Sequence, residues 1–135
     1  MNSSGIQLIA ELDGCPANLL DDEEHLKVLL IEGIENCGMF HLNTISHKYE
    51  PIGVTVISII KESHIAIHTY PEAQHASVDI FHCSTDSKAL FQLLEFLKVR
   101  LKAKTMNYME IHRGHQLALS ENSAKTLEGV GIKRD

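Results

Sequence analysis

Three short apolar runs follow one another in the middle of the chain, and the links between them are too short to hold a helix. The runs lie at about 54–60, 65–69 and 77–82, and the first is rich in β-branched residues. Residues 71–75, which begin with a proline, turn the chain before the third run. A parallel pair of strands would need a crossover of a dozen or more residues, so these runs are expected to pair antiparallel.

Two amphipathic helical patterns flank this region. Apolar residues at i, i+3 and i+4 spacing extend from about Asp21 to a stop at Gly38, and a second set follows Ser84–Ser87. The acidic residues at 21–24 are explained by capping and the helix macrodipole, and Ser84–Ser87 is expected to cap the second helix. The two apolar faces comprise Leu26, Leu29, Leu30, Ile34 and Cys37, and Leu90, Leu93, Leu94, Leu97 and Leu101.

Further strands are predicted at Ile6–Leu12, which alternates apolar and polar residues, at about 39–49, and at about 106–112. The order βαββββαβ predicts an α+β fold: a two-layer sandwich in which two helices cover one face of an antiparallel sheet. The other face of the sheet then needs cover, and we expect a symmetric homodimer to provide it. No period is sustained in the tail after about residue 114.

Composition narrows the class of protein. A chain of 135 residues is expected to form one domain, residues 1–135. Its three cysteines, with no Cys-x-x-Cys pair, disfavour a disulfide framework or a zinc cluster and favour a reducing, cytoplasmic setting. A formal charge of −6 with scattered Lys and Arg argues against nucleic acid as a partner. No run approaches the roughly twenty apolar residues that cross a bilayer, so neither a membrane nor a leader segment is expected.

A serine, a histidine and a cysteine on neighbouring runs are the residue types of nucleophilic chemistry. Ser63 stands just before the second run, which contains His68. Cys83 directly follows the third run and Thr55 lies in the first. Strict alternation would put Ser63 and His68 on opposite faces of the sheet. We therefore predict that residues 62–64 form a turn or bulge instead of regular strand.

Three kinds of site compete on these residues alone. A Cys83–His68 thiol hydrolase and a Ser63–His68 hydrolase both lack the motif that usually surrounds their nucleophile. A metal site is disfavoured because His64 and His68 would lie about 13 Å apart on a strand, too far to share an ion. The full histidine set for that alternative is His64, His68, His75 and His82.

The motifs of the chain resemble those of a known family, the prokaryotic S-adenosylmethionine decarboxylase proenzymes, which depend on a pyruvoyl group. The most specific elements are Glu62-Ser63-His64 and Ile67-His68-Thr69-Tyr70-Pro71-Glu72, with Asp79-Ile80-Phe81 and Cys83 downstream. Weaker matches are Gly5 to Leu12, His47 to Thr55, and Glu110 to Gly114.

The resemblance implies that the chain cuts itself between residues 62 and 63. Ser63 Oγ would attack the carbonyl of Glu62, and elimination and hydrolysis would leave a pyruvoyl group at residue 63. The products would be a β chain of residues 1–62 and an α chain of residues 63–135. His68 and Thr55 resemble the pair that assists this processing.

The resemblance also implies the roles in decarboxylation. The pyruvoyl carbonyl would condense with the substrate amine and draw electrons as carbon dioxide leaves. Cys83 resembles the proton donor, Tyr49 and Tyr70 the rings that sandwich adenine, and Glu72 the acid that holds the ribose hydroxyls. Glu11 resembles an acid that contacts the substrate amine or methionyl end.

Several residues near these positions differ from the usual family pattern. They are Val56, Lys61, Ala73-Gln74-His75 and His82-Cys83-Ser84. They leave open a basic amino acid, ornithine or arginine, as the substrate of the same pyruvoyl chemistry. An unprocessed, non-catalytic homologue is a further alternative.

Overall fold

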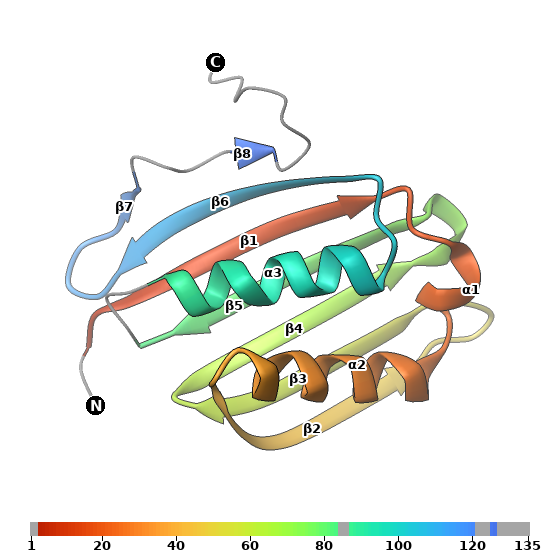
Figure 1. Cartoon of the computed structure of the whole chain (residues 1–135), viewed down its shortest axis with the longest axis horizontal. Coiled ribbons are helices and arrows are strands. Elements are labelled where there is room, and N and C mark those ends of the chain that lie inside the picture. Colours follow the sequence, from red (N-terminus) through yellow and green to blue (C-terminus); the bar gives the residue numbers. More distant parts are fainter. Residues whose placement is uncertain (1–2, 84–86, 121–124, 127–135) are drawn as a thin grey trace.

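The computed structural model describes residues 3–83, 87–120 and 125–126, and in these the chain forms one antiparallel sheet with helices on one face (Figure 1). The strand order is β2-β3-β4-β5-β1-β6-β7, and β8 also pairs with β6. The strands are β1 Gly5–Asp13, β2 Phe40–Lys48, β3 Val54–Lys61, β4 Ser63–Tyr70, β5 His75–His82, β6 Thr105–Arg113, β7 Ala118–Leu119 and β8 Lys125–Thr126. The helices are α1 Ala17–Leu20, α2 Glu23–Asn36 and α3 Lys88–Arg100, and a 3-10 turn, η1, covers Pro71–Ala73.

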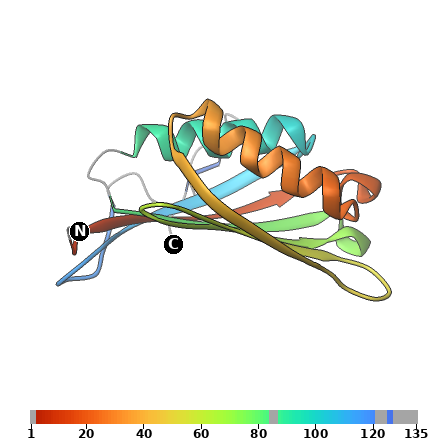
Figure 2. The same cartoon turned by 90° about the horizontal axis from the view of Figure 1, so that it is seen from below.

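The core lies between the sheet and the two long helices. Alternate residues of each central strand point to the helices and are buried, as in β1, where Ile6, Leu8, Ala10 and Leu12 are 2 % exposed or less. Helix α2 begins after Asp22, whose carboxylate accepts the backbone N–H of His25 at 3.1 Å. Both long helices lie on the same side of the sheet (Figure 2). The predicted α+β sandwich is therefore confirmed.

The other face of the sheet, called here the open face, is covered by no helix among the described residues (Figure 2). It carries exposed apolar side chains beside polar ones. Ile45 on β2 is 61 % exposed and Ile59 on β3 is 50 % exposed, while Ile9 and Met109 lie nearer the middle of the sheet. Exposed apolar side chains of this kind are common where a surface contacts another molecule, and the expected homodimer stays a prediction.

The predicted strands and long helices are all present, with ends that differ by a few residues. The short helix α1 and the two-residue strands β7 and β8 were not predicted. Residues 84–87 were expected to cap α3. Ser87 stands at the N-cap but makes no capping hydrogen bond, and the expectation for residues 84–86 lies outside the described residues. No described helix has the length and apolar character needed to span a membrane.

Candidate active site

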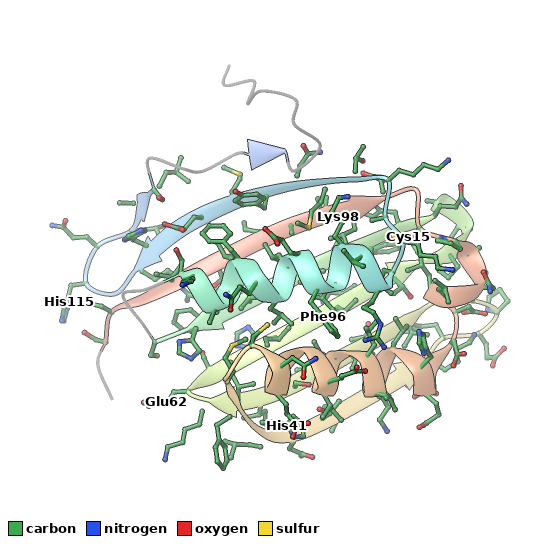
Figure 3. All side chains as sticks on the ribbon, viewed as in Figure 1. Cys15, His41, Glu62, Phe96, Lys98 and His115 are labelled. Carbon is green, nitrogen blue, oxygen red and sulfur yellow. The ribbon has the colours of Figure 1, made fainter. Side chains whose placement is uncertain are left out.

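A single residue, Glu62, joins β3 to β4 at the tip of their hairpin (Figure 3). The turn predicted at residues 62–64 is thus present only at Glu62. The prediction is wrong for Ser63 and His64, which pair with β3 as regular strand because the hairpin closes through one residue. Ser63, the first residue of β4, has a φ of 132°. Only glycine adopts such a conformation without strain, and the cost for other residues is about 1–3 kcal/mol.

A cavity of about 470 Å³ opens beside this turn. Glu62, Ser63 and Cys83 line it, together with Phe81 and Ile59. The backbone N–H of Cys83 donates to the carbonyl oxygen of Glu62 at 3.3 Å. That carbonyl belongs to the peptide bond before Ser63, so its oxygen already has a donor in place should the carbon be attacked.

A second cavity, of about 330 Å³, lies at the opposite end of β4. It is lined by Thr55, His68, Tyr49, Tyr70 and Glu72. Thr55 and His68 are direct cross-strand partners, and Thr55 Oγ1 lies 3.1 Å from His68 Nδ1. The hydroxyl of Tyr49 is 3.1 Å from the same Thr55 oxygen, which makes a polar chain of three side chains.

The two tyrosines of the second cavity keep much of their ring surface accessible. Tyr49 is 46 % exposed and Tyr70 is 45 % exposed. The η1 turn places Glu72 next to Tyr70, and buried Pro71 fixes that turn. The cavity thus offers two aromatic rings and one carboxylate, a combination suited to a planar base linked to a hydroxyl-bearing group.

Glu11 lies on the open face, two strands from His68. The cross-strand register runs from His68 to Ser77 and then to Glu11. Glu11 accepts the Ser77 hydroxyl at 2.6 Å and contacts His75 Nε2 at 2.7 Å, while His75 Nδ1 is 2.8 Å from Asp13. Burial lowers the pKa of His75, but its hydrogen bonds to Asp13 and Glu11 outweigh burial and leave the pKa raised.

The two cavities divide the predicted site residues into two groups. Glu62, Ser63 and Cys83 form the first group, and Thr55 and His68 belong to the second with the two tyrosines and Glu72. Ser63 and His68 are five residues apart on β4, which is about 16 Å at roughly 3.3 Å per residue. One chain therefore does not bring the serine and the histidine together.

His82 is a neighbour of Ser63 to which the sequence gave no catalytic role; it was considered as a possible metal ligand and as a departure from the family pattern. The two are cross-strand partners in the β4–β5 pair. The Nδ1 atom of His82 is buried and has no hydrogen-bond partner among the described residues, and burial lowers the pKa of the imidazole. A sequence prediction that paired the runs on either side of the turn at 71–75 as a hairpin would have placed His82 opposite Ser63.

No described group of three or more His, Cys, Asp or Glu side chains is arranged to hold a metal ion.

Comparison with known proteins decides between the kinds of site left open by the sequence. The family model described as S-adenosylmethionine decarboxylase matches residues 6–114. The chain belongs to this family. Members of the family are carboxy-lyases, which excludes the two hydrolase alternatives.

Individual relatives agree with the family assignment. The chain is 35% identical over 114 residues to proteins named S-adenosylmethionine decarboxylase proenzyme from Methanococcus maripaludis (strain C5) and from Acetivibrio thermocellus. The match covers 84% of this chain and 93% and 91% of those two relatives.

Two solved structures resemble the fold. The crystal structure of the adenosylmethionine decarboxylase from Aquifex aeolicus VF5 matches with a TM-score of 0.77 and 26% identity, over 93% of this chain and 100% of that one. The Trypanosoma brucei AdoMetDC-delta26 monomer matches with a TM-score of 0.60 and 12% identity, over 78% of this chain and 45% of that one, a likeness of fold alone.

Proposed function

We propose that this chain is a self-processing, pyruvoyl-dependent decarboxylase that converts S-adenosylmethionine to its decarboxylated form for spermidine synthesis in the cytoplasm. The observation that carries the proposal is the geometry before Ser63. A serine in a strained backbone conformation directly follows a carbonyl whose oxygen accepts the N–H of Cys83. The proposed cut separates a β chain, residues 1–62, from an α chain, residues 63–135.

Self-cleavage requires no outside reagent except water. Ser63 Oγ bonds to the carbonyl carbon of Glu62, the amide bond breaks, and the proton of the hydroxyl ends on the Ser63 nitrogen. The Cys83 N–H stabilises the oxyanion formed on the way. Loss of the Ser63 Cα proton then expels the Glu62 carboxylate and leaves dehydroalanine, which takes up water and releases ammonia. Relief of the strain at Ser63 favours the first step.

The residues around Ser63 suit a pyruvoyl group made from it. Such a group supplies a carbonyl that withdraws electrons from the α-carbon of a bound amine substrate. Cys83 lines the same cavity as Ser63, so its thiol is within the space where a proton must return to that carbon. Ile59 and Phe81 add apolar walls to this space.

The second cavity favours an adenosyl substrate. Tyr49 and Tyr70 offer ring faces for adenine, and Glu72 offers a carboxylate for ribose hydroxyls. Ornithine and arginine have neither a nucleobase nor a ribose and would leave these groups without a role. The names of the relatives also point to S-adenosylmethionine.

A homodimer would reconcile the two groups of residues. One substrate must meet both groups, yet they lie about 16 Å apart on one chain. In a symmetric pair, the Thr55–His68 group of one protomer can face the Ser63–Cys83 group of its partner, and the symmetry generates two equal sites. The apolar residues of the open face support contact between two copies there.

Co-expression of two differently tagged variants tests the cleavage and its shared site together. On a denaturing gel the wild type is expected to give two fragments, whereas Ser63→Ala and His68→Ala each give one uncut chain. Co-expressed, the two variants form mixed dimers in which the His68→Ala chain still has Ser63 and faces an intact His68. Cleavage of that chain alone supports the proposal. A wild type that stays uncut would favour the non-catalytic alternative and defeat the proposal.

Carbon dioxide release tests the substrate. Wild-type protein is incubated with S-adenosylmethionine, ornithine and arginine in parallel. Release from S-adenosylmethionine alone is expected, and Ser63→Ala should release none. Release from ornithine or arginine instead would support the pyruvoyl chemistry but would show that S-adenosylmethionine is not the substrate.

A further inference from the structure

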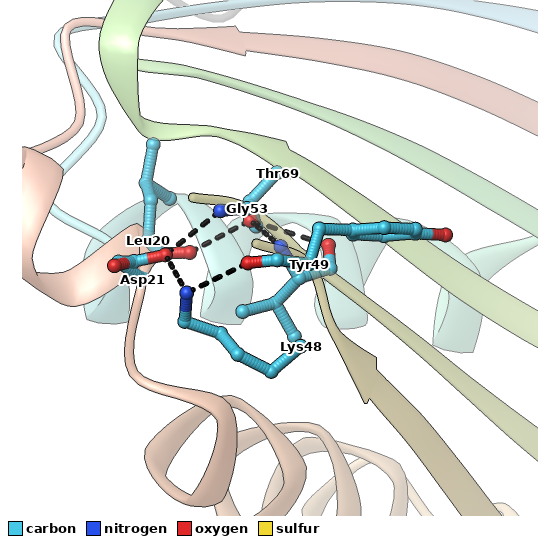
Figure 4. Close-up of polar contacts among 7 residues, drawn as sticks. Leu20, Asp21, Lys48, Tyr49, Gly53 and Thr69 are labelled. Atoms are coloured by element: carbon cyan, nitrogen blue, oxygen red, sulfur yellow. Dashed lines mark hydrogen bonds and ion pairs between the residues drawn. The ribbon is translucent and has the colours of Figure 1, made fainter. Parts of the chain in front are cut away.

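The loop that carries Tyr49 is tied to the other layer of the molecule by one carboxylate. This loop, residues 49–53, joins β2 to β3, and Asp21 lies between α1 and α2 (Figure 4). Asp21 Oδ1 accepts the backbone N–H of Gly53 at 2.8 Å and lies 3.1 Å from Lys48 Nζ. The same Lys48 ammonium donates to the carbonyl oxygen of Tyr49 at 3.0 Å. Asp21 thus holds both ends of the loop.

Contacts that do not involve Asp21 also restrict the conformation of the loop. Its ends are joined by the hydrogen bond from Tyr49 N–H to Gly53 O, at 2.8 Å. Gly53 has a φ of 109°, and a side chain there would lie 3.3 Å from the carbonyl oxygen of Thr69, so the backbone runs close to β4. Thr69 adds a second anchor, because its hydroxyl donates to Leu20 O at 2.7 Å and accepts Val54 N–H at 2.9 Å (Figure 4).

The position of the loop is transmitted to the second cavity through Tyr49. The Tyr49 backbone is held by Lys48, and its hydroxyl is bonded to Thr55, which in turn contacts His68. We propose that Asp21 is a positioning residue for substrate recognition: through Gly53 and Lys48 it sets where the Tyr49 ring stands against the adenosyl group. The inference rests on the proposed function, in which Tyr49 stacks on adenine.

The charge of Asp21 is suited to this task. The Gly53 N–H is the main cause, and Lys48 a further one, that lowers the pKa of the Asp21 carboxyl below its usual value. The carboxylate is therefore present at every pH at which the protein is expected to work. Hydrogen bonds to an ionised acceptor are shorter and stronger than neutral ones, which makes this a stiff tether for an exposed loop.

The test compares ligand binding and turnover in Asp21→Asn, Asp21→Ala and wild type. Asparagine can still accept the Gly53 N–H but loses the attraction to Lys48, and alanine loses both. We expect KM for S-adenosylmethionine to rise about threefold in Asp21→Asn and about tenfold or more in Asp21→Ala, while kcat of the cleaved enzyme changes less than about twofold. Binding of 5′-methylthioadenosine to uncut Ser63→Ala protein, measured by calorimetry, should weaken by the same factors when the Asp21 changes are added.

Asp22→Ala is the matched control. Asp22 is the next residue, it also makes one hydrogen bond to a backbone N–H, and its loss should lower the melting temperature by a few degrees, about as much as the loss of Asp21. Among the described residues Asp22 makes no hydrogen bond or ion pair with the loop, so KM should stay at the wild-type value. An equal rise of KM in both alanine variants, or no rise in either, overturns the inference.

Two further measurements distinguish a failure of the inference about Asp21 from a failure of the proposed function. If Asp21→Ala does not fold, Asp21→Asn and Lys48→Met replace it. Their effects on KM should be less than additive, because each of them removes the same ion pair between Asp21 and Lys48. Full additivity would contradict the role of that pair. If wild-type protein binds no 5′-methylthioadenosine and does not turn over S-adenosylmethionine, the proposed function itself has failed, and the inference fails with it.

Discussion

At the scale of single residues, the conformation of Ser63 is the feature closest to the chemistry. Its φ of 132° is one that a side chain disfavours and that glycine adopts freely. Strain of this kind is tolerated where the surrounding structure enforces it, and here the β3–β4 hairpin and the Cys83–Glu62 hydrogen bond do so. The strained torsion, about the N–Cα bond of Ser63, is directly next to the peptide bond that the proposed reaction breaks.

This strain predicts an unusual order of stability for two variants that cannot cleave. Ser63→Gly should be more stable than Ser63→Ala by about 1 kcal/mol, because relief of strain exceeds the extra flexibility of glycine in the unfolded chain. Urea unfolding followed by circular dichroism measures the difference. Ala66→Gly, in the regular part of β4, is the control and should lose stability. A Ser63→Gly protein less stable than Ser63→Ala would show that the φ is not strained.

His75 predicts a dependence of stability on pH. Its folded pKa is raised by Asp13 and Glu11 against the effect of burial, so the folded chain binds the His75 proton more tightly than the unfolded chain. The resulting stabilisation is fully present below the ordinary pKa of about 6.5 and is lost as the pH rises through the folded value. The stability lost in His75→Gln should therefore be larger at pH 5.5 than at pH 8.5, as measured by urea unfolding at each pH. A loss that grows with pH would contradict this assignment.

At the scale of elements, periodicity was sufficient for the parts that bury a continuous apolar face. β1 and α2 were predicted within a few residues because alternation and i, i+3, i+4 spacing follow directly from burial. The four-residue helix α1 and the short strands β7 and β8 are too brief to show a period. Ser87, the one described residue of the cluster expected to cap α3, makes no capping bond. Its side chain is hydrogen-bonded to Glu110 on β6 instead, a partner that no local pattern indicates.

Contact between the helices depends on Gly33. A Cβ added there would lie 2.7 Å from Phe96 Cδ1 and 2.8 Å from Leu93 Cδ1. Phe96 belongs to α3 and lies on the side of that helix that faces α2 (Figure 3). Gly33→Ala should therefore destabilise the fold by about 1–2 kcal/mol, although alanine is the better helix former. Thermal unfolding checks this, with exposed Val28→Ala as the control within about 0.5 kcal/mol of wild type. A stabilised Gly33→Ala would mean that the helices can separate at little cost.

At the scale of the whole molecule, the sequence placed Thr55 and His68 correctly on their strands, but it placed Ser63 in a turn and did not give the distances between the candidate residues. Thr55 and His68 could be paired from hairpin geometry, since each belongs to a neighbouring strand. Ser63 and His68 could not be joined by the predicted turn, because a turn changes the direction of a side chain but not the length of strand between two residues. Nor could a contact such as Asp21–Gly53 be foreseen, since no local pattern links residues that far apart.

The open face provides the last prediction, which concerns assembly. If two copies meet through this face, Ile45→Asp puts a charge into the contact and should shift the protein from dimer to monomer in sedimentation at micromolar concentration. Ile45 lines neither cavity, yet self-cleavage should slow by about tenfold or more, because Ser63 of one protomer would lose the partner's His68. Val99→Asp is the matched control: Val99 is 71 % exposed on α3, in the other layer, and its change should leave mass and cleavage unaltered. A monomeric Ile45→Asp that cleaves at the wild-type rate would show that one chain holds a complete processing site.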